Sequence, residues 1–219
     1  MSRIPPLGPE VPVWKGRWLL RALGWVVVWL CRWRVTGEFP NVAKAVVIAA
    51  PHSSLFDGII GISAATAINI KPTWMGKDAL FKGVFGWFLR LFGGVPTDRS
   101  NPRGVVGQMV ARFADSEKLW VVLAPEGTRR QVKHWRSGFY HIAVGAGVPI
   151  FPVYFHYPEK RIGLLPLFYP TGDMQADLNA LQQMYEPWRG RHGKPVAPAA
   201  ADAAAKPAPE ADAGSADRA

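Results

Sequence analysis

Short apolar runs alternate along the chain with segments whose apolar residues recur at helical spacing. Continuous apolar runs are typical of buried strands, and they cover residues 45–49, 119–124 and 148–155. Amphipathic or small-residue segments, typical of helices, cover residues 18–31, 59–70, 81–92, 102–113, 138–146 and 174–185. Residues 71–77 and 161–169 are further candidates for strands. Because strands alternate with helices, we predict an α/β fold with a mixed, largely parallel sheet wrapped by helices.

Two of these segments have features that affect their packing. The strand at 148–155 contains Pro149 and Pro152, which predict an edge position or an irregular start because proline has no N–H for a sheet ladder. The helix at 81–92 has an aromatic-rich stripe, which we expect to pack in the core or, in part, to contact lipid or an acyl chain. The stripe consists of Phe81, Val84, Phe85, Phe88, Leu89 and Phe92.

The N-terminal apolar segment at 18–31 has tryptophans and arginines at both ends and is followed by Arg32-Trp33-Arg34. It is short for a membrane span, which needs roughly 20 apolar residues. No small-residue cleavage site of a signal peptide follows it. We therefore expect a helix that lies in the membrane interface, with its arginines reaching toward phosphates. The alternative is a helix that packs against the domain core.

Composition supports contact with a membrane. The 219 residues are 49% hydrophobic and carry a net charge of +10, with ten Trp and eleven Phe. A basic, aromatic-rich surface suits nucleic acid or an anionic membrane, and no nucleic-acid-binding motif is present. We divide the chain into an N-terminal hydrophobic helix (1–36), one globular domain (37–192) and an Ala/Pro-rich tail (193–219) predicted to be disordered. A single cysteine, Cys31, excludes an intramolecular disulfide and a cysteine-based zinc cluster.

Polar residues follow the first buried strand at its carboxyl end. His52 lies in the expected strand-to-helix turn, and Asp57 lies in the first helical turn, where Ser54 and Asp57 fit a capping box. A carboxylate that holds one imidazole nitrogen fixes the tautomer and raises the basicity of the ring. The pattern predicts a catalytic His52–Asp57 pair. The alternative is a loop histidine beside a capping aspartate.

Two further polar stretches are candidates for anion binding. Asp98 and Arg99 precede the helix at 102–113, and an arginine beside a helix N-terminus suits a phosphate. The alternative for this pair is a surface ion pair of little energetic value. Glu126, Gly127, Thr128 and Arg129 follow the strand at 119–124, at the sheet edge where α/β proteins place their sites, and Lys133, His134 and Arg136 add positive charge.

Four segments in this order resemble the motifs of the glycerolipid acyltransferase family, which includes the 1-acyl-sn-glycerol-3-phosphate acyltransferases. His52-Ser53-Ser54-Leu55-Phe56-Asp57 matches the H-x4-D motif, and Glu126-Gly127-Thr128-Arg129 is identical to the E-G-T-R block. Gly94-Val95-Pro96-Thr97-Asp98-Arg99 looks like the second block, although Pro96-Thr97 stands where Phe-Ile is usual. Val148-Pro149-Ile150-Phe151-Pro152-Val153 looks like the fourth, and the resemblance covers roughly residues 40–190.

The resemblance implies an O-acyltransferase that moves a fatty acyl group from acyl-CoA or acyl-carrier protein to the free hydroxyl of a lysophospholipid, converting lysophosphatidate to phosphatidate. It implies that His52 is the general base and that Asp57 orients it. The substrate-binding residues would be Asp98, Arg99, Glu126, Gly127, Thr128 and Arg129, with the two arginines on the acceptor phosphate. No metal and no bound cofactor are expected, nor is nucleic acid a partner. The expected location is the cytoplasmic face of a membrane, as a monotopic or peripheral protein.

Three alternatives remain open from the sequence. The first is an acyltransferase that acts on another lyso-lipid, such as lyso-ornithine lipid. The second is a non-catalytic peripheral membrane-binding protein. The third is a metal-dependent hydrolase using His52, Asp57 and Asp98, which the absence of an H-x-H or H-E-x-x-H element disfavours.

Overall fold

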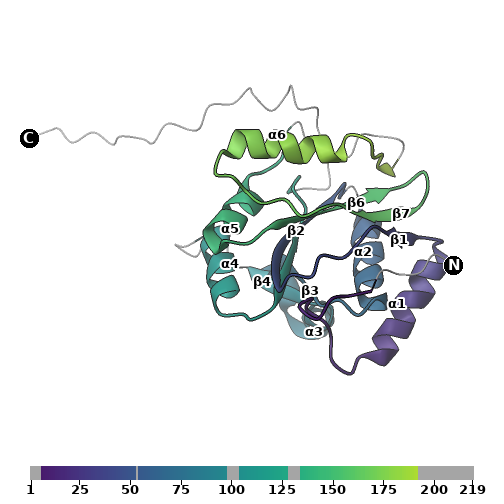
Figure 1. Ribbon diagram of the computed structural model, residues 1–219. Helices are drawn as coiled ribbons and strands as arrows, with labels where there is room; N and C mark the ends of the chain where they lie inside the picture. Colours follow the sequence, from purple (N-terminus) through teal and green to yellow (C-terminus); the bar gives the residue numbers. More distant parts are fainter. Residues whose placement is uncertain (1–5, 53, 98–103, 128–133, 192–219) are drawn as a thin grey trace, which may run out of the picture.

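The computed structural model describes residues 6–52, 54–97, 104–127 and 134–191. Within these residues one seven-stranded sheet forms the centre of the fold, with the strand order β1-β7-β6-β2-β5-β3-β4 (Figure 1). Every neighbouring pair is parallel except β6 and β7. The strands are β1 (Arg34–Thr36), β2 (Lys44–Ala50), β3 (Pro72–Lys77), β4 (Gly94–Thr97), β5 (Leu119–Leu123), β6 (Ile150–His156) and β7 (Arg161–Leu164). The predicted mixed, largely parallel α/β sheet is therefore confirmed.

Helices cover both faces of this sheet. They are α1 (Trp18–Leu30), α2 (Leu55–Ala67), α3 (Gly83–Leu91), α4 (Gly104–Ala114), α5 (Gly138–Ala146) and α6 (Met174–Tyr185), with a short 3-10 helix η1 (Asp78–Phe81) before α3. In Figure 1, α4, α5 and α6 lie on one side of the sheet and α1 and α2 on the other. Successive residues of β2 alternate between the two cores: Val46 and Ile48 face the α4–α6 side, while Ala45 and Val47 face the α1–α2 side. This is why β2 is apolar from Ala45 to Ala50, as expected of a strand buried on both faces.

The expectation of an edge position for the strand at 148–155 is wrong. β6 lies inside the sheet, between β7 and β2. Pro152 lies in β6 and Pro149 directly precedes it, and both contribute carbonyl groups: Pro149 accepts from the N–H of Val46 at 3.0 Å, and Pro152 accepts from the N–H of Leu165 at 3.0 Å. Both prolines therefore take part in backbone hydrogen bonding through their carbonyl groups, although neither has an N–H to donate.

The aromatic stripe at 81–92 divides between core and surface. Phe81 is buried under β3 and β4, whereas Val84, Phe85 and Phe88 on α3 are exposed. The sequence pattern predicted an amphipathic helix, but the tertiary structure turns most of its apolar face outward.

Helix α1 packs on α2 along one side. A Cβ atom at Gly24 would lie 2.6 Å from the carbonyl oxygen of Ser63, so glycine permits the close approach of the two helices. The other side of α1 exposes Trp18, Leu19, Leu23, Trp25, Val26, Trp29 and Leu30. Packing on α2 agrees with the alternative of a helix held against the domain, and the location of α1 in a membrane interface stays a prediction. In the part of the chain that the structure describes, no helix is long and apolar enough to cross a membrane.

Candidate active site

The carboxyl ends of β2 and β5 lie side by side because these strands pair in parallel, with Ile48 opposite Leu123. The turn after β2 and the loop after β5 therefore meet at one edge of the sheet. The backbone N–H of His52 donates to Oε2 of Glu126 at 2.8 Å, although the two residues are 74 positions apart. Two of the motifs that the sequence singled out are joined by this bond.

The N-terminus of α2 holds Asp57 in a defined position. Its side chain is 1% exposed, and its Oδ2 accepts from the backbone N–H of Ser54 at 2.7 Å. The predicted capping box is confirmed. The hydroxyl of Tyr157 donates to the other oxygen, Oδ1. The Asp57 carboxylate is thus held from both sides at the positive end of a helix, which stabilises its charge.

The imidazole of His52 lies against the first turn of the same helix. A Cβ atom added at Gly58 would lie 3.6 Å from Cε1 of the ring, in van der Waals contact. His52 is half-buried, so the ring lies at the boundary between the protein interior and solvent. The structure places the imidazole beside the helical turn that contains Asp57.

Burial raises the pKa of Glu126 from 4.5 to about 7. The bond from the His52 backbone opposes this change, and the negative charge of Asp57 reinforces the increase. Only 7% of the residue is exposed. Glu126 therefore changes its protonation state near neutral pH, which is a property of groups at functional sites.

The loop after β5 folds tightly at Gly127. Its φ of +63° suits glycine, and a Cβ atom there would lie 2.6 Å from Cδ of Arg136. The backbone N–H of Arg136 donates to the carbonyl of Pro125 at 2.8 Å, which closes the loop. Glycine at position 127 therefore permits the close approach of the Arg136 side chain.

Asp98, Arg99, Thr128 and Arg129 lie outside the described residues. Their predicted roles in substrate binding stay predictions. In the described part of the chain, no three His, Cys, Asp or Glu side chains are grouped to hold a metal ion.

Two tyrosines of this edge were not singled out from the sequence. Tyr157 directly follows β6, and burial together with the bond to Asp57 raises the pKa of its hydroxyl. Tyr185 of α6 is fully buried and donates to the carbonyls of Ile48 at 2.8 Å and Val153 at 3.2 Å, which ties α6 to β2 and β6. A signal for Tyr157 existed, because it stands at the carboxyl end of an apolar run, as His52 and Glu126 do.

The comparisons with known proteins agree with this arrangement. The family model named Acyltransferase matches residues 32–156, which is more than half of the chain. The chain belongs to the acyltransferase family. The resemblance that rested on the four sequence motifs is therefore confirmed.

Relatives in several bacteria carry the name 1-acyl-sn-glycerol-3-phosphate acyltransferase. The protein of Streptococcus pneumoniae is 28% identical over 153 residues, which are 68% of this chain and 56% of that protein. The protein of Pseudomonas aeruginosa is 28% identical over 143 residues, which are 62% of this chain and 52% of that protein. Human lysophospholipid acyltransferase LPCAT4 is 31% identical over 137 residues, 59% of this chain and 25% of its own. The chain spans about half the length of the bacterial relatives.

The crystal structure of the 1-acyl-sn-glycerophosphate acyltransferase PlsC from Thermotoga maritima has a similar fold. It superposes with a TM-score of 0.56 at 17% sequence identity and covers 79% of this chain and 80% of its own. At this identity the likeness concerns the fold alone.

Proposed function

We propose that this protein transfers a fatty acyl group from an acyl thioester to the free hydroxyl of a lysophospholipid, with lysophosphatidate as acceptor and phosphatidate as product. The observation that carries the proposal is the bond between His52 and Glu126, which unites the H-x4-D turn and the E-G-T-R loop at one sheet edge. Family membership and the printed names of the bacterial relatives support it.

In the proposed reaction the imidazole of His52 takes the proton of the acceptor hydroxyl as general base. The resulting oxygen nucleophile attacks the thioester carbon, the C–S bond breaks, and the imidazolium returns the proton to the departing thiolate. Asp57 orients the imidazole and stabilises its charged form. Its burial and its bonds to Ser54 and Tyr157 support this role, because they hold the carboxylate in place.

The proposal also covers how the acyl donor and the acceptor are bound. The donor is acyl-CoA or acyl-carrier protein, and backbone donors near the His52 turn stabilise the oxyanion. Arg99 and Arg129 bind the acceptor phosphate, and Glu126 orders the loop through its bond to the His52 backbone. The exposed apolar side of α1 supports a location in the interface at the cytoplasmic face of a membrane, where a lipid acceptor resides.

The test is acyl transfer from labelled acyl-CoA to lysophosphatidate in detergent micelles. We expect activity in the wild type and a loss of about a hundredfold or more in His52→Ala, since general base catalysis contributes about 10²–10⁴ in rate. His141→Ala is the matched control, because His141 is an exposed histidine on α5 that belongs to none of the four motifs. Equal activity of His52→Ala and wild type would contradict the proposal.

If the wild type does not acylate lysophosphatidate, lyso-ornithine lipid and an acyl-carrier-protein donor are offered next. Activity there would establish the acyltransferase with a different acceptor or donor. A protein that binds vesicles but is inactive with every pair would be a non-catalytic membrane-binding protein.

A further inference from the structure

A basic cavity opens at the edge of the sheet opposite the candidate active site. It has a volume of about 460 Å³ and lies at the amino ends of β3 and β5 and along most of the edge strand β4. Four cationic residues line it, and none of the described residues in its wall is acidic. The cations are Lys71, Arg90, Arg112 and Lys118.

This cavity is separate from the site at His52. Strand β5 connects the two, because Leu119 lines the cavity and the loop after Leu123 carries Glu126. Five residues of strand span roughly 16 Å at about 3.3 Å per residue. A phosphate in the cavity is therefore not the acceptor phosphate near His52.

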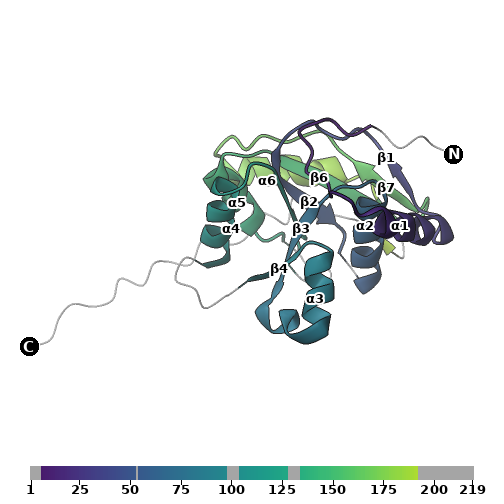
Figure 2. The same cartoon turned by 90° about the horizontal axis from the view of Figure 1, so that it is seen from below.

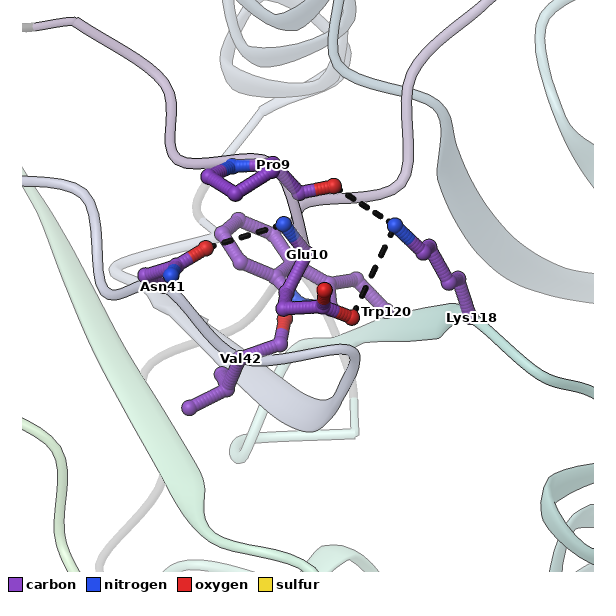
Figure 3. A network of polar contacts seen from close by, with 6 residues as sticks. All are labelled: Pro9, Glu10, Asn41, Val42, Lys118 and Trp120. Carbon is purple, nitrogen blue, oxygen red and sulfur yellow. Dashed lines mark hydrogen bonds and ion pairs between the residues drawn. The ribbon is translucent and has the colours of Figure 1, made fainter.

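Two of the four cations have fixed partners inside the protein. Nζ of Lys118 donates to the carbonyl of Pro9 at 2.6 Å and lies 3.6 Å from a carboxylate oxygen of Glu10. Figure 3 shows this contact, together with the bond from the Glu10 backbone to Asn41, which ties the N-terminal segment to the residues just before β2. Arg90 donates from Nη1 to the carbonyl of Phe81 at 2.8 Å. These two side chains shape the wall.

Lys71 and Arg112 supply the positive charge that the described carboxylates do not neutralise. The ion pairs among the described residues are Lys118–Glu10 and Arg161–Glu159, and neither includes them. Nζ of Lys71 lies 5.6 Å from the ring centroid of Trp14, which also lines the cavity. Backbone forms part of the same wall at Gly93, where a Cβ atom would lie 1.9 Å from the carbonyl oxygen of Pro72. The cavity thus offers cations and close backbone in a concave space of ligand size.

Exposed apolar helices flank this cavity. Arg17, just before α1, donates to the carbonyl of Leu91 at the end of α3, which joins the start of α1 to the end of α3 close to the wall residues Trp14 and Gly93. Trp18 and Leu19 of α1 and Val84, Phe85 and Trp87 of α3 are exposed. Both helices lie at the bottom of the molecule in Figure 1, and Figure 2 views that side.

We propose that this cavity binds the phosphate headgroup of an anionic phospholipid in the bilayer, while the exposed faces of α1 and α3 enter the interface around it. The charge of the cavity suits an anion, and the apolar side chains beside it suit the acyl region to which that anion is attached. The headgroup site is independent of the proposed acyl transfer, because it lies at the other end of the strands and uses no residue of the His52 site.

The test compares binding of the full chain to vesicles of phosphatidylcholine and to vesicles in which part of it is replaced by phosphatidylglycerol. We expect Lys71→Gln/Arg112→Gln to lose the preference for anionic vesicles by roughly 25-fold, at roughly fivefold for each cation near the surface. The matched control is Lys160→Gln/Arg189→Gln, which removes the same charge from the turn before β7 and from the segment after α6; neither residue belongs to the N-terminal segment expected at the membrane interface. All four side chains are exposed, so both variants should keep the wild-type unfolding midpoint.

The outcomes separate the possible sources of the anion. A large loss in the cavity variant and a change below roughly threefold in the control support the headgroup site. Equal losses of the preference in the two variants would show that the whole basic surface attracts the membrane. No loss in either variant would show that the cavity does not bind a headgroup. Either result would overturn the proposal. Inorganic phosphate or CoA that stabilises the wild type but not the cavity variant, without vesicle preference, would assign the cavity to a soluble anion instead. Acyl transfer in detergent should be unchanged in the cavity variant, which keeps this test distinct from that of the proposed function.

Discussion

Two buried carboxylates, Asp177 and Glu126, have opposite electrostatic behaviour in the same fold. Asp177 on α6 accepts from the hydroxyl of Tyr140 at 2.8 Å and from the N–H and hydroxyl of Thr171 at 2.7 and 2.8 Å. Burial raises its pKa, but these bonds outweigh burial and hold the pKa below the usual 3.8. Among the described residues Glu126 receives one donor, the His52 N–H, and burial raises its pKa to about 7.

The number of hydrogen-bond donors to each carboxylate, rather than its burial, therefore explains why one pKa is lowered and the other is raised. Both residues are less than a tenth exposed. Asp177 is charged at neutral pH and ties α6 to α5 and to the segment before α6. Within the described residues, Glu126 accepts a single hydrogen bond, at the meeting point of two strand ends, and its raised pKa is typical of a group at a functional site.

The largest effect is expected for Asp57→Asn, a substitution in the candidate active site that also contains Glu126. The amide keeps the shape of the carboxylate but not the charge that stabilises an imidazolium. We expect acyl transfer to fall by about 10²–10⁴, with a much smaller change in the free energy of unfolding. Steady-state rates and denaturant unfolding of the same samples check this. A variant with wild-type kcat would remove Asp57 from the mechanism.

Asp177→Ala should lower stability and leave activity unchanged, which is the reverse of the result expected for Asp57→Asn. The variant leaves the buried hydroxyl of Tyr140 and the N–H of Thr171 without their acceptor, so we expect a loss of roughly 3–4 kcal/mol in the free energy of unfolding. Activity per folded molecule should stay at the wild-type value, because Asp177 contacts no residue of the His52 site in the described structure. Urea unfolding and activity measured below the transition separate the two quantities. A loss of activity without a loss of stability would contradict the purely structural role of Asp177.

Glu126 and Asp177 should also make the free energy of unfolding depend on pH in opposite ways. Because the pKa of Glu126 is raised in the folded state, the stability it contributes is complete below pH 4.5 and is lost as the pH rises through about 7. Relative to Glu126→Gln, we expect the wild type to lose roughly 3 kcal/mol across this window, since each pKa unit corresponds to about 1.4 kcal/mol. Asp177 has the opposite sign, and its contribution is lost as the pH falls below 3.8. Parallel curves for wild type and Glu126→Gln from pH 4 to 8 would contradict the raised pKa.

Tyr157→Phe should give the smallest effect. It removes one donor to Asp57 and leaves the bond from Ser54 in place. We expect about 1 kcal/mol less stability and a decrease of less than about tenfold in kcat, because one hydrogen bond is lost. The pH profile of kcat should shift as the carboxylate is held less firmly. The double variant Asp57→Asn/Tyr157→Phe should then be no less active than Asp57→Asn alone.

Much of the fold was predictable because it depends on local pattern. Continuous apolar runs predicted β2, β5 and β6, and helical spacing predicted α5 at Gly138–Ala146 and α6 at Met174–Tyr185. The Asp173 cap of α6, whose side chain accepts from the N–H of Ala176 at 3.0 Å, was likewise readable from neighbouring residues. In the site, His52 and Asp57 were predictable for the same reason, since a turn and a capping box involve residues only a few positions apart.

The rest depended on which strands pair and in which register. Local pattern predicted the six helices and most of the strands, but it did not predict β1, β4 or η1. Only the tertiary structure decided that Glu126 binds the backbone of His52, that Tyr157 reaches Asp57, and that β6 lies inside the sheet. It also gathered Lys71 and Arg112 into one cavity. These contacts join residues far apart in the chain, and their geometry follows from the parallel register of the sheet, which no local pattern of hydrophobic and polar positions specifies.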